Sequence, residues 1–118
     1  MTNALFDEFD VTAGGQRAFG LLRTHGTSLK AMYAAVLDEV KETLPGLIPQ
    51  GLYTTEQLCG PELWGSWPHV GQRRAAGMCL AHLVQVGAVA LDVHKTGSGK
   101  GPRRYVLRYR KVLVTCAD

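Results

Sequence analysis

The sequence predicts an α+β fold that is mostly helical, in which several helices precede a β-hairpin. Three observations support this prediction. Apolar residues recur at helical spacing between positions 29 and 44. Residues 54–68 begin with a helix-capping pattern and continue with Pro and Gly residues that interrupt a helix. After position 88, apolar and polar residues alternate on both sides of a glycine-rich stretch. The length of 118 residues allows one compact domain with its own core.

The first 27 residues are predicted to form a helical extension. Residues 12–24 carry apolar side chains at helical spacing, although Gly14, Gly15 and Gly20 each destabilise a helix by roughly 1 kcal/mol relative to alanine. His25 and Gly26 are expected to end this helix. Residues 1–11 mix apolar and acidic side chains, and this pattern fits either packing on the core or docking on another surface.

The clearest predicted element is an amphipathic helix over residues 29–44. Thr27 or Ser28 offers an N-cap, and Pro45 followed by Gly46 prevents continuation. The apolar positions share one face of the helix, which is expected to be core: Leu29, Met32, Tyr33, Val36, Leu37, Val40 and Leu44.

Two further helices are predicted between residues 54 and 87. Thr54 and the glutamine three residues later form a capping box for a short helix that ends near Gly60. A longer helix is expected to begin near Ser66 or Pro68 and to end at Gly87. Its apolar face is predicted to contain Val70, Gly77, Leu80, Leu83 and Val84.

Period-two alternation predicts a β-hairpin at the C-terminal end of the sequence. Val89, Leu91 and Val93 alternate with polar or small residues in the first strand, and 105–110 alternates in the second. Residues 96–102 join them as a basic, glycine-rich turn.

This order of helices, short helix, turn, longer helix and hairpin resembles the winged helix-turn-helix superfamily over residues 28–111, including the passage from the end of the longer helix into Val89 and Leu91. The resemblance implies an N-terminal extension 1–27, a winged domain 28–111 and a tail 112–118. In such a domain the longer helix enters the DNA major groove and the hairpin, or wing, contacts the backbone. The turn 61–68 and the wing are longer than in many relatives.

Charge is distributed unevenly along the chain. Residues 1–68 carry four basic and eight acidic side chains, a net charge of −4, whereas residues 69–111 carry nine basic side chains and a single acid, Asp92, a net charge of +8. This asymmetry favours a polyanion-binding face, and the alternative is a solvated cationic surface.

Eight residues are predicted to contact DNA. Arginine pairs with two acceptors of guanine, and glutamine pairs with adenine. Flexible cations in a wing meet phosphates or insert in the minor groove. The predicted set is His69, Gln72, Arg73 and Arg74 at the start of the longer helix, with Lys95, Lys100, Arg103 and Arg104 in the wing. The alternatives are a solvated helix face and a hairpin that serves solubility.

The primary functional hypothesis is sequence-specific binding of double-stranded DNA by a transcriptional regulator of bacterial or mobile-element origin. A homodimer would use apolar residues of the extension: Phe6, Phe9, Phe19, Leu21 and Leu22. The alternative hypothesis is a protein-protein interaction module, or an inhibitor that blocks a nucleic-acid-binding partner, with Trp64 and Trp67 as a candidate contact.

Other functional classes receive little support from the sequence. No catalytic grouping stands out, so an enzyme is not expected, and Gly97–Gly101 lacks the pattern of a phosphate-binding loop. Cys59, Cys79 and Cys116 show no metal-binding spacing, and neither a metal nor another cofactor is predicted. The acidic N-terminus differs from a secretory signal, no stretch is long enough to span a bilayer, and a cytoplasmic location is expected.

Overall fold

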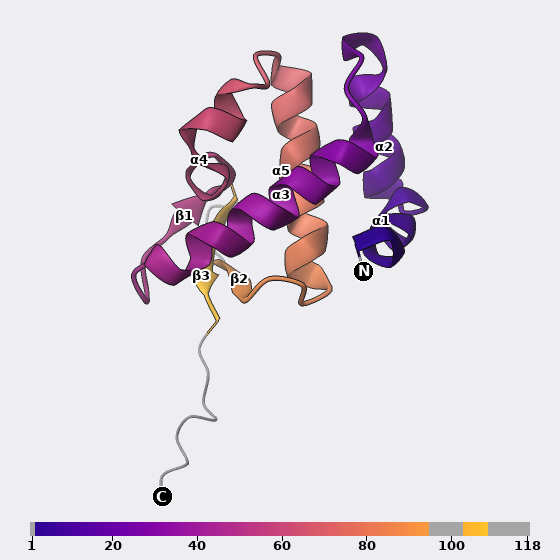
Figure 1. The fold of residues 1–118 in the computed structure, drawn as a ribbon. Helices are drawn as coiled ribbons and strands as arrows, with labels where there is room; N and C mark the ends of the chain where they lie inside the picture. The colour runs from indigo at the N-terminus through magenta and orange to yellow at the C-terminus, as the bar shows by residue number, and fades with distance from the viewer. Residues whose placement is uncertain (1, 95–102, 109–118) are drawn as a thin grey trace, which may run out of the picture.

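The computed structural model describes residues 2–94 and 103–108, including the side chains of 4–94 and 103–108. Figure 1 shows α3 crossing α5, with α1 and α2 on one side of this pair and α4 and the sheet on the other. The elements are α1 (Thr2–Asp10), α2 (Ala13–Leu22), the 3₁₀ turns η1 (Arg23–His25) and η2 (Leu44–Gly46), α3 (Leu29–Thr43), β1 (Tyr53–Thr54), α4 (Thr55–Gly65), α5 (Val70–Gln85), β2 (Leu91–His94) and β3 (Arg104–Leu107). The predicted mostly helical α+β class is confirmed.

The N-terminal helices are joined by a close turn. The side chain of Thr12 caps α2 by accepting a hydrogen bond of 2.9 Å from the amide of Gly15. Gly15 is buried against the last turn of α1, and a β-carbon there would overlap the carbonyl oxygen of Phe9. The space requires glycine at this position, although glycine has low helix propensity.

Helix α3 agrees closely with the sequence prediction. Ser28 is its N-cap and accepts a hydrogen bond of 3.2 Å from the amide of Ala31. Gly26, with φ of 65°, ends the preceding 3₁₀ turn in the left-handed conformation that glycine adopts readily. The predicted apolar face is buried from Leu29 to Val40, and Leu44 is half-buried at its end.

The next two helices differ from the prediction at their ends. The capping box of Thr54 and Gln57 begins α4 as expected, and the backbone leaves the helical conformation at Gly60, with φ of 84°, where the short helix was predicted to end; α4 continues beyond this kink to Gly65. Pro61 then begins a further helical turn. Helix α5 begins at Val70, later than predicted, and ends at Gln85. Gly87 follows its C-cap, and a φ of 78° there allows the amide of Ala88 to donate to the carbonyl of Leu83.

The three strands form an antiparallel sheet in the order β1-β3-β2. Arg104 of the central strand lies opposite both Thr54 and His94, and Tyr105 lies opposite Tyr53 and Val93. The first predicted strand begins at Leu91 instead of Val89, because the residues before it belong to the turn that ends α5. Residues 95–102 and 109–111 of the predicted wing and second strand lie outside the described residues.

One hydrophobic core joins all the helices. Phe9 of α1 lies in it, with its ring centroid 5.2 Å from that of Tyr33, so residues 4–10 pack on the core. The hydroxyl of Tyr33 is hydrogen-bonded at 2.8 Å to Nδ1 of His82 across α3 and α5. Burial lowers the pKa of His82, with the charge of Glu8 acting in the opposite direction, and burial raises the pKa of Tyr33.

Most of the apolar surface that was expected to support a dimer is used inside one molecule. Phe9 and Leu22 are buried, Phe6 and Leu21 are half-buried, and Phe19 remains 56% exposed. Intramolecular packing therefore explains the larger apolar side chains of residues 4–27 apart from two, Val11 and Phe19, which are 79% and 56% exposed. Within the described part of the chain, no helix is both long and apolar enough to cross a lipid bilayer.

Candidate functional site

The start of α5 gathers four of the predicted DNA-contacting residues, and it is held by the segment that joins α2 to α3. The rings of His69 and His25 are stacked, with centroids 4.3 Å apart and an interplanar angle of 18°. A β-carbon on Gly71 would lie 3.3 Å from the carbonyl oxygen of Leu21, so the backbones of α5 and α2 approach closely there. These contacts fix the position of the first turn of α5.

Gln72 occupies a different environment from the one expected of a residue that projects from the helix into a DNA groove. Its side chain is 6% exposed. Its Oε1 accepts a hydrogen bond of 3.0 Å from the amide of His69, and its Nε2 donates one of 2.8 Å to Oγ1 of Thr27. Because both ends of the side-chain amide are engaged inside the protein, Gln72 holds the start of α5 instead of presenting hydrogen-bonding groups to solvent.

Arg73 lies between the interior and the surface. The carbon at the centre of its guanidinium group is 5.3 Å from the centroid of the Trp64 ring, a distance at which a cation is attracted to the face of an aromatic ring. Its side chain is half-buried, and Nε has no hydrogen-bond partner among the described residues. Trp64 therefore restricts the directions in which this cation can point.

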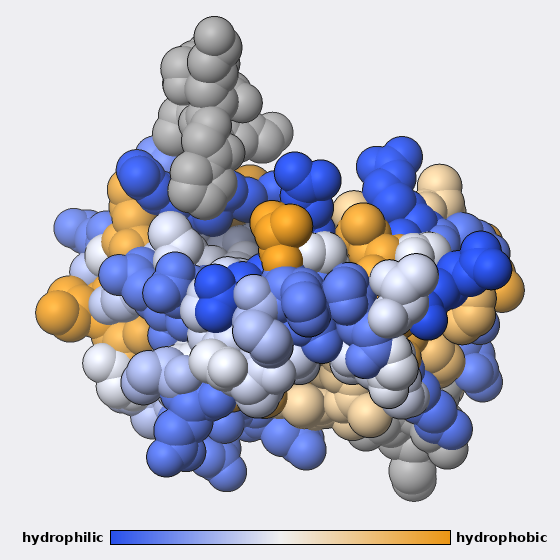
Figure 2. Space-filling view, turned by 90° about the horizontal axis from the view of Figure 1, so that it is seen from above, coloured by the Kyte–Doolittle hydropathy of each residue, from blue (hydrophilic) through white to orange (hydrophobic). Residues whose placement is uncertain are grey.

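Arg74 and Val70 form the exposed part of the first turns of α5. Arg74 is exposed, and Val70 is 68% exposed, although the sequence pattern had placed Val70 on the apolar face. Helix α5 contains no Asp or Glu. Figure 2, which looks onto the end of the molecule where α4 meets α5, shows a mostly hydrophilic surface with apolar side chains standing out singly. A basic helix end without acidic neighbours on its own helix suits a negatively charged ligand.

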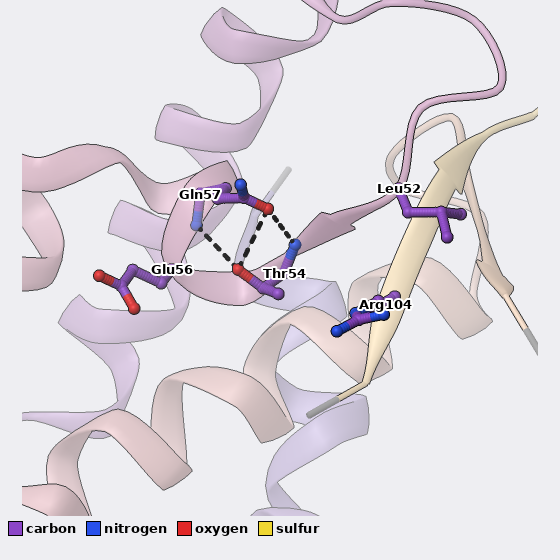
Figure 3. A pocket seen from close by; sticks show the side chains of 5 residues that line it. All are labelled: Leu52, Thr54, Glu56, Gln57 and Arg104. Atoms are coloured by element: carbon purple, nitrogen blue, oxygen red, sulfur yellow. Dashed lines mark hydrogen bonds between the residues drawn. The ribbon is translucent and has the colours of Figure 1, made fainter. Parts of the chain in front are cut away.

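The second predicted group lies at the beginning of β3. Arg103 and Arg104 are exposed, whereas Lys95 and Lys100 lie outside the described residues. Arg104 faces an open hollow of about 450 Å³. Figure 3 shows that the other side chains around this hollow come from Leu52, Thr54, Glu56 and Gln57, at β1 and the start of α4. Among the polar contacts of the described residues, none joins this group to the start of α5.

Arg108, directly after β3, is paired with an acid of the neighbouring strand. Its Nε lies 3.2 Å from Oδ1 of Asp92, and its terminal nitrogen donates to the carbonyl of Leu91 at 3.2 Å. Asp92, the only acid in residues 69–111 of the sequence, is therefore paired across the hairpin. Arg74, Arg103 and Arg104 keep no such partner among the residues that the structure describes.

The other sequence candidates have structural roles. Trp67 is 6% exposed, and Trp64 packs against it edge to face beneath Arg73, so neither ring forms an open apolar patch. Cys59 and Cys79 are buried, and burial, aided by the charge of Glu39, raises the pKa of Cys59 to about 12. Within residues 4–94 and 103–108, no three His, Cys, Asp or Glu side chains are grouped closely enough to hold a metal ion.

Sequence reasoning missed the residues that hold the start of α5. His25 and Thr27 were expected only to end one helix and cap the next, yet they contact His69 and Gln72 across about 45 residues of sequence. Comparison of the chain with protein families, curated proteins and solved structures gave no match. The geometry of the described residues is therefore the basis for assigning a function.

Proposed function

We propose that the chain is a winged helix-turn-helix protein that binds double-stranded DNA and regulates transcription. The order α3, β1, α4, α5, β2, β3 and the strand order β1-β3-β2 support this proposal, since the helix pair α4 and α5 is followed by a hairpin whose second strand pairs with β1. A regulator of bacterial or mobile-element origin would act in the cytoplasm.

The observation that carries the proposal is the exposed Arg74 in the first turns of α5, a helix without acidic residues. In a winged helix these turns approach the major groove, which is about 12 Å wide and accepts a helix. Arg73 adds a second positive charge at the same end of the helix. Arg103 and Arg104, at the base of the hairpin, supply cations for the phosphate backbone.

The proposal is tested by titrating the protein with fluorescent double-stranded DNA at several salt concentrations. The logarithm of the association constant should fall linearly with the logarithm of salt, by about 0.9 for each phosphate that is neutralised. Three such contacts would weaken binding roughly fortyfold between 50 and 200 mM salt. Replacing Arg103 and Arg104 together with glutamine should weaken binding to all sequences and reduce the slope by about 1 for each lost contact.

Lys30 and Lys41 provide a matched control, because both are exposed on α3 and their replacement by glutamine removes the same two positive charges. This control should leave the slope near that of the parent. If binding is independent of salt, or if both double variants reduce the slope equally, a specific DNA-binding face at α5 and β3 is ruled out.

A further inference from the structure

Four groups form a continuous chain of hydrogen bonds from the α2–α3 segment to the start of α5. The hydroxyl of Thr27 donates to the carbonyl of His25 at 3.5 Å and accepts from Nε2 of Gln72 at 2.8 Å. The Oε1 of Gln72 in turn accepts from the amide of His69 at 3.0 Å. The chain therefore ends on the residue that caps α5.

The hydroxyl of Thr27 is the acceptor on which this series of hydrogen bonds depends. Gln72 is buried, and its Nε2 has Thr27 as its hydrogen-bond partner among the described residues. A buried amide that loses its partner is driven to reorient towards another polar group or water. Because the opposite end of the same amide caps α5, reorientation of Gln72 also removes the hydrogen bond to His69.

The residues whose direction this affects follow Gln72 immediately in the sequence. Arg73 and Arg74 lie in the first two turns of α5, and the helix backbone carries any change in its first turn to their side chains. Base contacts depend on hydrogen-bond geometry, whereas attraction to phosphates depends chiefly on charge. A displaced helix start should therefore weaken the choice between DNA sequences more than it weakens binding itself.

We propose that Thr27 is a positioning residue for DNA sequence recognition, which it serves by holding Gln72 and thereby the first turn of α5. This inference rests on the proposed DNA-binding function. It adds Thr27, which lies before α3, to the residues that determine which DNA sequence the protein prefers. Thr27 itself is half-buried and need not contact DNA for this role.

The test compares two substitutions that differ in one group. Thr27→Val keeps the branched shape and removes the hydroxyl, whereas Thr27→Ser keeps the hydroxyl and removes a methyl group. A preferred site is first selected from random double-stranded DNA with the parent protein. Dissociation constants of parent and variants are then measured for that site and for a scrambled duplex, at two salt concentrations.

Thr27→Val should reduce the ratio of the two dissociation constants by about fivefold or more, the lower end of what one bidentate base contact provides. Affinity for the scrambled duplex and the salt slope should stay close to those of the parent, and Thr27→Ser should retain the ratio. The proposal is overturned if Thr27→Val keeps the parent ratio, or if both variants lose it equally.

A second measurement needs no DNA. The amide of His69 donates to Gln72, and that of Arg73 donates to the carbonyl of His69. Hydrogen exchange at these two amides of the free protein should accelerate in Thr27→Val and not in Thr27→Ser, while amides in the middle of α3 remain protected. Unchanged exchange in Thr27→Val overturns the proposed link to α5. If Thr27→Val unfolds at the assay temperature, Thr27→Ala takes its place in both comparisons. A parent protein that binds no DNA refutes the DNA-binding function itself, and the exchange result then reports on the hydrogen-bond chain alone.

Discussion

The guanidinium group of Arg73 lies over the ring of Trp64, with 5.3 Å between its central carbon and the ring centroid. The two residues come from adjacent helices, α5 and α4, and Trp64 packs in turn against the buried Trp67. This contact links the turn between the two helices to the side chain that follows Gln72. It also has a measurable energy, because a cation over an exposed or half-buried aromatic ring stabilises the fold by about 0.5–1 kcal/mol.

A double-mutant cycle should detect this energy. We expect Trp64→Leu and Arg73→Gln to show a coupling of about 0.5–1 kcal/mol in the free energy of unfolding, measured with urea. The pair Trp64→Leu and Arg74→Gln is the matched control, since no contact of Arg74 with Trp64 is found among the described residues. Additive effects for Trp64 and Arg73 would show that the observed stacking contributes no stability.

Two glycines of α2 should respond in opposite directions to alanine. A β-carbon at Gly15 overlaps the carbonyl of Phe9, so Gly15→Ala forces α1 and α2 apart and should destabilise the fold by about 1–3 kcal/mol. Gly20 has no atom within 4 Å of the same position, and Gly20→Ala should stabilise the helix by up to about 1 kcal/mol. Urea denaturation of the two variants measures both effects. Equal behaviour would contradict the observed crossing of α1 and α2.

The stability of the protein should depend on pH through His82. Burial lowers the pKa of His82 below its ordinary value near 6.5, so the unfolded chain binds a proton more readily than the folded one. The stabilising contribution is therefore fully present above about pH 6.5 and is lost as the pH falls from there towards the folded pKa. Protonation also places a positive charge beside Phe9 and Tyr33 in the core.

Urea unfolding at pH 7.5, 6.5 and 5.5 measures this dependence. His82→Gln keeps a hydrogen-bonding group and cannot be protonated in this range, so it should flatten the decrease. His94→Gln changes an exposed histidine on β2 and serves as the control that keeps the decrease. A parent protein with equal stability at the three pH values would contradict the buried environment of His82.

The success of the sequence predictions follows from which interactions are local. The α3 helix, its Ser28 cap and the Thr54 capping box depend on residues within one or two turns of each other, and their patterns are visible in the sequence. Alternation likewise indicated the two strands of the hairpin, although Val93, predicted on the same side as the buried Leu91, is 40% exposed. The interruption at Gly60 was predicted as the end of a helix, but the further helical turn that Pro61 begins directly after it was not predicted.

The candidate site was harder to predict, because its residues are oriented by distant partners. Gln72 and Arg73 have the polarity of surface residues. Nothing in the local pattern indicates that Thr27 accepts a hydrogen bond from Gln72, or that the ring of Trp64 lies against the guanidinium group of Arg73. Val70 was predicted to be buried from its apolar character, yet the helix turns it outward at 68% exposure. The packing of α2, the α2–α3 segment and α4 against α5 determines which face of the helix start is covered.

The different environments of Gln72 and Arg74 predict unequal consequences for alanine at two positions that the sequence had treated alike. Gln72→Ala removes a buried amide that caps α5 and satisfies Thr27, so it should lower the free energy of unfolding by about 1–3 kcal/mol. Arg74→Ala removes an exposed side chain from a helix that alanine favours, and the stability should change by less than about 0.5 kcal/mol. Thermal and urea unfolding of the two variants measure this difference. On the selected DNA site both variants should lose discrimination, Gln72→Ala because the start of α5 is no longer held and Arg74→Ala because a bidentate arginine contact contributes about 1–3 kcal/mol. Arg74→Lys, which keeps the charge and loses the planar fork, should lose much of that discrimination while retaining affinity for scrambled DNA. If Arg74→Lys discriminates as well as the parent, Arg74 contacts phosphate instead of a base, and sequence recognition must reside in another part of the protein.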